Sequence, residues 1–148
     1  MNKLFLTLVG AAMIGSPILQ RSADSQILPP AKRAPRVQIT EGPAPESAKD
    51  TWAIITWTSN NPGGMDEHFG VVHYGTDPND LSLTAKGHVR LNQTHSYTVF
   101  RVMLNGLQPG TTYYYTVASM GSSGADDGVK STIAHFATTG VQPVTAAK

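Results

Sequence analysis

The sequence predicts an all-β domain, a seven-stranded β-sandwich, and three observations support this fold class. Apolar residues alternate with period two in short runs, and no stretch of about eleven residues or more keeps a helical apolar period. Clusters of Gly, Pro, Asn and Asp separate the runs, as expected for turns between strands. The chain has 148 residues and no Cys, so a disulfide framework is excluded and a hydrophobic core must stabilise the fold.

Seven strands are expected, in chain order at residues 37–40, 51–58, 70–75, 83–89, 96–104, 112–120 and 130–138. The first is short and the fourth is weakly patterned. The alternation in the second strand places on one face Ala53, Ile55 and Trp57. In the third strand, Val72 and Tyr74 share a face. The loop Asn60–Gly64 and the turn Asp77–Asp80 separate these runs.

The later strands show the same period. One face of the fifth carries Thr98, Phe100, Val102 and Leu104. The sixth has on one face Tyr113, Tyr115 and Val117, and the seventh has Thr132, Ala134 and Phe136. The Gly/Ser-rich segment Gly121–Gly128 is expected to be a flexible loop before the last strand.

The N-terminus has the pattern of a secretory signal peptide over residues 1–25. A basic start precedes the apolar run Leu4–Leu19, and Ala23 and Ser25 are small residues ahead of a cut before Gln26. As a helix the apolar run spans about 24 Å, shorter than the hydrocarbon core of a bilayer. We therefore expect a secreted or periplasmic protein with no membrane span after signal cleavage. An uncleaved membrane anchor is the alternative.

Residues 26–36 are predicted to be a Pro-rich basic linker, residues 37–139 the folded domain and residues 140–148 a disordered tail. The formal net charge is +1. That balance argues against a nucleic-acid partner, which requires a basic face.

The segment Leu107–Tyr113 (LQPGTTY) resembles the L-x-P-G-T-x-Y tyrosine corner of fibronectin type III domains. Trp57 and Tyr74 match the core Trp and Tyr of that family's second and third strands. The resemblance implies an immunoglobulin-like, fibronectin type III β-sandwich in which the corner hydroxyl bonds to nearby backbone. It assigns a structural role to Leu107, Pro109, Gly110 and Tyr113.

Within that superfamily the chain is similar to the N-terminal domain of purple acid phosphatases over residues 37–139. The likeness is carried by Ile55–Trp57, Val72–Thr76, Leu104–Val117 and His135–Thr138. In those enzymes a second, larger domain holds the two-metal centre, and its GD and GNH motifs do not occur in this sequence. The resemblance therefore implies the fold without the activity. We expect no catalytic residue, metal or cofactor, and no enzyme activity from this chain on its own.

Two sets of residues are candidate sites. The outward positions of the third, sixth and seventh strands form an apolar, almost uncharged face that is expected to dock a partner, namely Val71, His73, Tyr114, Thr116, Ala118, Ile133 and His135. The alternative is ordinary β-propensity on an exposed sheet. Two loops at one end of the sandwich bring together Asp66, Glu67, His68, Asp126 and Asp127. Their carboxylates suit a hard cation such as calcium, and solvated loop charge is the alternative.

These features lead to three hypotheses of function. The first is a secreted, non-catalytic fibronectin type III-like binding or scaffold module whose partner is a protein or an envelope polymer. The second is a detached N-terminal module that acts with a separate metallophosphatase chain. The third is carbohydrate binding, for which Trp52 and Tyr114 are the candidate aromatic residues.

Overall fold

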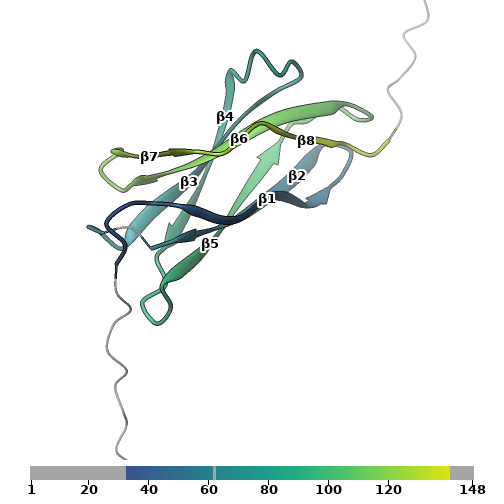
Figure 1. Ribbon diagram of the computed structural model, residues 1–148. Coiled ribbons are helices and arrows are strands. Elements are labelled where there is room, and N and C mark those ends of the chain that lie inside the picture. Colours follow the sequence, from purple (N-terminus) through teal and green to yellow (C-terminus); the bar gives the residue numbers. More distant parts are fainter. Residues whose placement is uncertain (1–32, 62, 141–148) are drawn as a thin grey trace, which may run out of the picture.

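The computed structural model describes residues 33–61 and 63–140, which form two antiparallel sheets packed face to face (Figure 1). The strands are β1 (Ile39–Ala48), β2 (Trp52–Asn60), β3 (Glu67–Gly75), β4 (Leu83–Arg90), β5 (Tyr97–Asn105), β6 (Thr112–Gly121), β7 (Asp126–Lys130) and β8 (Ala134–Ala137). One sheet has the order β1-β2-β5. The other has the order β4-β3-β6-β7, and β8 also pairs with β6. The predicted all-β sandwich is confirmed, with eight strands in the described part of the chain.

The core lies between the two sheets and is built from the alternating faces that the sequence predicted. In β2 and β5 every second residue is buried. The cluster of buried apolar side chains comprises Ala53, Ile55, Trp57, Val72, Tyr74, Leu91, Phe100, Val102, Leu104, Leu107, Tyr113, Tyr115, Val117 and Phe136. At its centre Trp57 stacks on Phe100, with ring centroids 5.2 Å apart and planes inclined by 6°.

The first strand is longer than predicted. A strand was expected at residues 37–40, whereas β1 spans Ile39–Ala48 and includes Pro43 and Pro45. It pairs with β2 alone, and its register shifts three times along the pair. Proline is tolerated there because an edge strand leaves half of its backbone N–H groups without a ladder partner.

The end of the chain also differs from the prediction. A single strand was expected at residues 130–138 after a flexible loop, whereas β7 begins at Asp126 and β8 follows after a break. Both segments pair with β6. Gly128, with φ of 77°, lies within β7, where the register with β6 is irregular. The strand β3 likewise begins at Glu67, earlier than predicted, so Glu67 and His68 lie in a strand.

The boundary of the folded body lies before residue 37. The backbone N–H of Ala34 donates to the carbonyl of Asn61 at 2.7 Å, and Gly63 donates to the carbonyl of Ala34 at 3.1 Å. The side chain of Asn60 donates to the carbonyl of Arg36 at 2.9 Å. Residues 33–36, predicted to belong to a linker, are therefore attached to the sandwich.

Some predictions fall outside the described residues. These are the signal peptide at 1–25, residues 26–32 of the linker and residues 141–148 of the tail. Within the described ranges, no helix is long and apolar enough to cross a membrane.

Candidate functional site

The tyrosine corner joins the start of β6 to the loop before it. The hydroxyl of Tyr113 accepts a hydrogen bond of 3.0 Å from the backbone N–H of Gln108. The ring of Tyr113 packs against Phe136 and Tyr74, with centroids 5.7 and 6.2 Å away. This geometry holds the loop against the core, as the family resemblance implies for Leu107, Pro109, Gly110 and Tyr113.

The two segments of predicted acidic loop residues do meet at one end of the sandwich. His68 points inward from β3 and is 2% exposed, and its Nε2 lies 3.7 Å from Oδ2 of Asp127. Ser119 donates to that same oxygen at 2.7 Å. Asp126 lies outside this contact, because its Oδ1 accepts from the backbone N–H of Gly128 at 2.6 Å.

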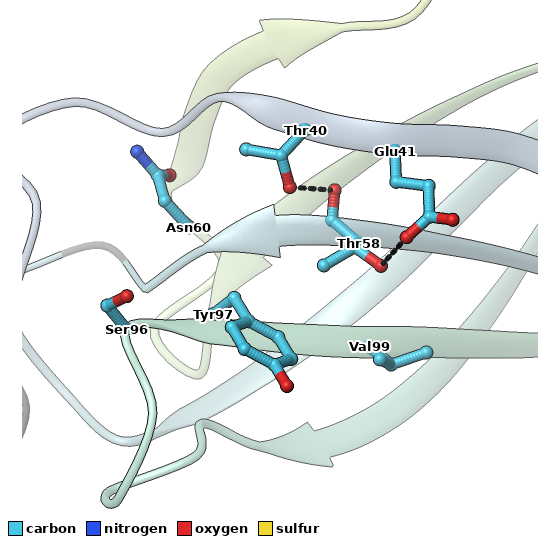
Figure 2. A pocket seen from close by; sticks show the side chains of 7 residues that line it. All are labelled: Thr40, Glu41, Thr58, Asn60, Ser96, Tyr97 and Val99. Atoms are coloured by element: carbon cyan, nitrogen blue, oxygen red, sulfur yellow. Dashed lines mark hydrogen bonds between the residues drawn. The ribbon is translucent and has the colours of Figure 1, made fainter.

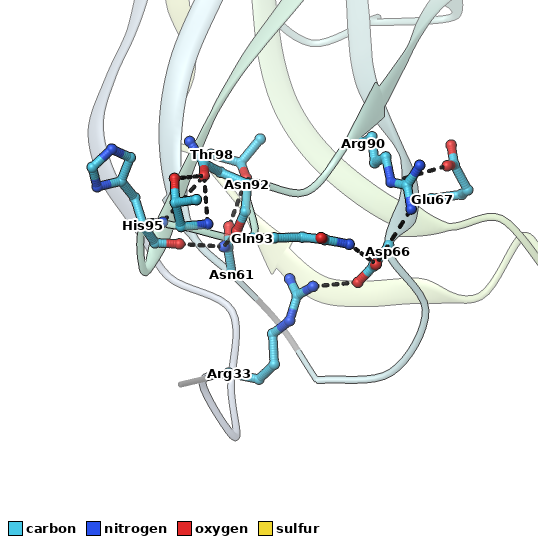
Figure 3. Close-up of polar contacts among 10 residues, drawn as sticks. Arg33, Asn61, Asp66, Glu67, Arg90, Asn92, Gln93, His95 and Thr98 are labelled. Atoms are coloured by element: carbon cyan, nitrogen blue, oxygen red, sulfur yellow. Dashed lines mark hydrogen bonds and ion pairs between the residues drawn. The ribbon is translucent and has the colours of Figure 1, made fainter. Parts of the chain in front are cut away.

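The remaining acidic residues at this end are paired with cationic and amide groups (Figure 3). Asp66 accepts hydrogen bonds from Arg33 and, at 2.6 Å, from Gln93. Glu67 lies 2.5 Å from the His88 ring and 3.8 Å from the Arg90 guanidinium. Residues 33–61 and 63–140 contain no group of three His, Asp or Glu side chains arranged to hold a metal ion. The hydrogen bonds and ion pairs at this end of the sandwich therefore hold Arg33 and the loop after β4 against the folded domain.

A buried amide that sequence reasoning missed lies beside this network. Asn61 is 1% exposed, and its Nδ2 donates to the carbonyls of Asn92 and His95 at 2.5 and 2.8 Å. Its Oδ1 accepts from the Thr98 hydroxyl at 2.6 Å. These bonds shape the connection between β4 and β5. No sequence signal marks Asn61, because its partners are 31 to 37 residues away.

The predicted docking face is the outer face of the five-stranded sheet, and it differs from the expectation in exposure and charge. Val71 is 2% exposed, and Thr116 and Ala118 are each 5% exposed. The register opposes Val71 to Lys86 on one side and Ala118 on the other, and Ala118 to Lys130. Two lysines thus flank the small central residues, so the face is neither uncharged nor uniformly open.

The other predicted residues of this face are more accessible. Ile133 is 53% exposed, and Tyr114 lies against the ring of His135 at 6.0 Å. The Nδ1 atom of His73 lies 3.2 Å from the Thr84 hydroxyl. Burial and then Lys130 lower the pKa of His73, with a further contribution from Lys86 and an opposing one from Asp126. On the same face, the next set of residues that lie opposite one another across β4, β3, β6 and β7 is His88, Phe69, Met120 and Asp126.

The outer face of the three-stranded sheet carries exposed apolar side chains that the sequence analysis did not single out. Along β5, Tyr97 is 45% exposed, Val99 48% and Met103 51%. Between them Arg101 forms a two-pronged ion pair with Glu46, at 2.6 and 2.5 Å. The alternation in β5 predicted that these side chains point outward. Their openness became visible only in the structure, because no described strand covers this face.

The two sheets, their order and the tyrosine corner define a fibronectin type III-like β-sandwich. The chain belongs to the family described as the purple acid phosphatase N-terminal domain, which it matches over residues 34–138. No curated protein matches it.

Solved structures resemble the chain at low sequence identity. The short form of the sensor domain of the anti-sigma factor RsgI4 in Pseudobacteroides cellulosolvens is 18% identical, with a TM-score of 0.51 over 71% of this chain and 96% of that one. The fibronectin type III domain of human fibronectin type III domain containing protein 3 is 13% identical, with a TM-score of 0.48 over 79% and 99%. At such identities the likeness concerns the fold alone.

Proposed function

We propose that this chain is an extracytoplasmic, non-catalytic module that binds a protein partner through the outer face of its five-stranded sheet. The observation that carries the proposal is the row Lys86, Val71, Ala118 and Lys130, in which two exposed lysines flank two small, well-covered apolar residues. The signal-peptide pattern of residues 1–25 supports export. The missing GD and GNH motifs support a role without catalysis.

The face suits a partner surface with an apolar centre and an acidic border. Strands lie about 4.8 Å apart, so the backbones of Lys86 and Lys130 are about 14 Å apart across β3 and β6. The accessible apolar surface comes from Phe69 and Met120 in the adjacent row and from Tyr114 beside β8, all of them partly exposed. Apolar cores with polar rims are typical of protein interfaces, and complementary charge directs the encounter.

In the test, the chain from Gln26 to Lys148 is mixed with envelope and medium fractions of its native host and cross-linked. The captured proteins are then identified by mass spectrometry. We compare the wild type with the double variant Lys86→Glu, Lys130→Glu. Lys49→Glu serves as the control, because Lys49 is an exposed lysine in the connection between β1 and β2. We expect a partner that the wild type and the control recover and the double variant loses. Equal recovery by all three folded proteins would refute the assignment of this face.

A second candidate function follows from the family itself. The matched family is the N-terminal domain of purple acid phosphatases. In this second candidate function the chain is a detached module that acts with a separate metallophosphatase chain. This alternative predicts that the recovered partner is such a chain and that acid phosphatase activity appears in the complex. Phosphatase activity of the purified mature chain alone would contradict both candidates.

A further inference from the structure

A groove crosses the outer face of the three-stranded sheet (Figure 2). It is a shallow, open groove with a volume of about 690 Å³. The proposed docking face belongs to the other sheet. The groove is lined by Thr40, Glu41, Thr58, Asn60, Ser96, Tyr97 and Val99. In the register of the sheet, Glu41, Thr58 and Val99 form one row, and Asn60 lies opposite Tyr97 in another.

Tyr97 provides a flat, half-exposed ring in this groove. The ring is 45% exposed and stacks on His95, with centroids 5.3 Å apart and planes inclined by 22°. Val99 follows on the same face of β5 and is 48% exposed. A tyrosine in such a position presents an apolar face together with a polar hydroxyl. The arrangement matches a ligand that is apolar on one face and polar at its rim.

The polar groups of the groove are held in place by bonds among themselves. Thr40 donates to the carbonyl of Thr58 at 3.3 Å, and the Thr58 hydroxyl donates to Oε2 of Glu41 at 3.4 Å (Figure 2). The other carboxylate oxygen of Glu41 makes no bond to the described residues. Glu41 and the hydroxyl of Ser96 are exposed. The groove thus offers a free carboxylate acceptor and hydroxyl groups around an aromatic ring.

The Asn60 side chain is engaged in holding the chain beside the groove. It accepts from the backbone N–H of Gln38 at 2.7 Å and donates to the carbonyl of Arg36 at 2.9 Å. We therefore assign Asn60 a supporting role and leave ligand contact to Tyr97, Glu41 and Ser96.

We propose that this groove binds a neutral sugar ring of an oligosaccharide or polysaccharide. The C–H face of a pyranose lies on Tyr97, and a ring hydroxyl donates to the free oxygen of Glu41. A neutral, hydroxyl-rich ligand is favoured over a basic peptide because most of the polar lining is hydroxyl and amide, with one carboxylate. The proposal concerns a different sheet and a different class of ligand from the protein-docking face.

The experiment titrates the mature chain with four neutral hexasaccharides, namely cellohexaose, chitohexaose, maltohexaose and mannohexaose, followed by calorimetry and by amide NMR shifts. We expect at least one to bind, with the largest shifts at residues 96–99. Tyr97→Ala should weaken binding about tenfold, which is ordinary for the loss of an aromatic contact at a binding centre. Glu41→Ala should also weaken it, and Tyr97→Trp should retain it.

Met103→Ala is the matched control, because Met103 is an apolar residue, 51% exposed, on the same outward face of β5 as Tyr97 but not in the lining of the groove. It should bind the sugar as the wild type does. Binding should also be nearly the same at low and high salt, because the sugar is neutral and forms no ion pair with Glu41. The proposal is overturned if none of the four sugars binds, or if Tyr97→Ala binds equally well. Preferential, salt-sensitive binding of a hexalysine peptide would likewise replace it with a basic-peptide site.

Discussion

Replacing Gly70 by alanine tests how tightly the centre of the core is packed. Gly70 lies on the inward side of β3, below the stacked rings of Trp57 and Phe100. An added Cβ would lie 2.8 Å from Cη2 of Trp57, 3.1 Å from its Cζ2 and 3.1 Å from Cδ1 of Phe100. Both rings are at most 2% exposed, so neither has solvent to move into. The added methyl group would therefore clash with two buried rings that have no room to move aside.

Inserting a carbon into a well-packed core costs about 1–3 kcal/mol. We expect Gly70→Ala to lower the free energy of unfolding by about 2 kcal/mol, in the middle of that range. In a domain of this size such a loss lowers the thermal midpoint by on the order of 10 °C. Urea unfolding followed by Trp57 and Trp52 fluorescence measures the same change as a shifted midpoint with an unchanged slope.

Gly63→Ala is the control for this experiment. The nearest atom to an added Cβ at Gly63 is the Ala34 carbonyl oxygen at 3.8 Å, an ordinary contact. Its effect should stay within about 0.5 kcal/mol, as for most surface substitutions. If Gly70→Ala and Gly63→Ala unfold at the same midpoint as the wild type, the reasoning about the ring stack is wrong.

Three further predictions concern single groups. Tyr113→Phe should cost about 1 kcal/mol of unfolding free energy in urea, because the N–H of Gln108 loses its acceptor; an unchanged midpoint would contradict a stabilising corner bond. Lys130→Ala should raise the pKa of His73 in an NMR titration, because Lys130 is the charge that lowers it most, and an unchanged pKa would show that Lys130 does not act on His73. Burial raises the pKa of Tyr115 to about 12, against about 10 for an unfolded tyrosine. The protonated, buried hydroxyl therefore contributes its full stability below about pH 10, and this contribution is lost as the pH rises through about 12. When urea unfolding is repeated across this pH range, the free energy of unfolding of Tyr115→Phe should fall less than that of the wild type.

The fold class and the core were predictable because they depend on local patterns. Alternation along β2 and β5 identified the side chains that face inward, including Ile55, Trp57 and Phe100. Turn-forming residues separated most of the strands. The LQPGTTY segment identified the corner, where the bond to Tyr113 spans only five residues. Each of these signals is contained in a short stretch of chain, so the sequence shows it directly.

The candidate sites were less predictable because they depend on register and on pairing between distant residues. Lys86 and Lys130 were not assigned to the docking face until the strand register placed them beside Val71 and Ala118. The predicted sugar-binding aromatics, Trp52 and Tyr114, lie on different sheets.

The sequence by itself therefore determined a two-sheet sandwich, its inward faces and its tyrosine corner. Only the tertiary structure decided which carboxylates are paired, as Asp66 is with Arg33, and that Tyr97 and Glu41 line one groove. The physical reason is distance along the chain. A strand's inward face follows from its own alternation, whereas a surface is assembled from strands whose register is set by the packing of the whole core.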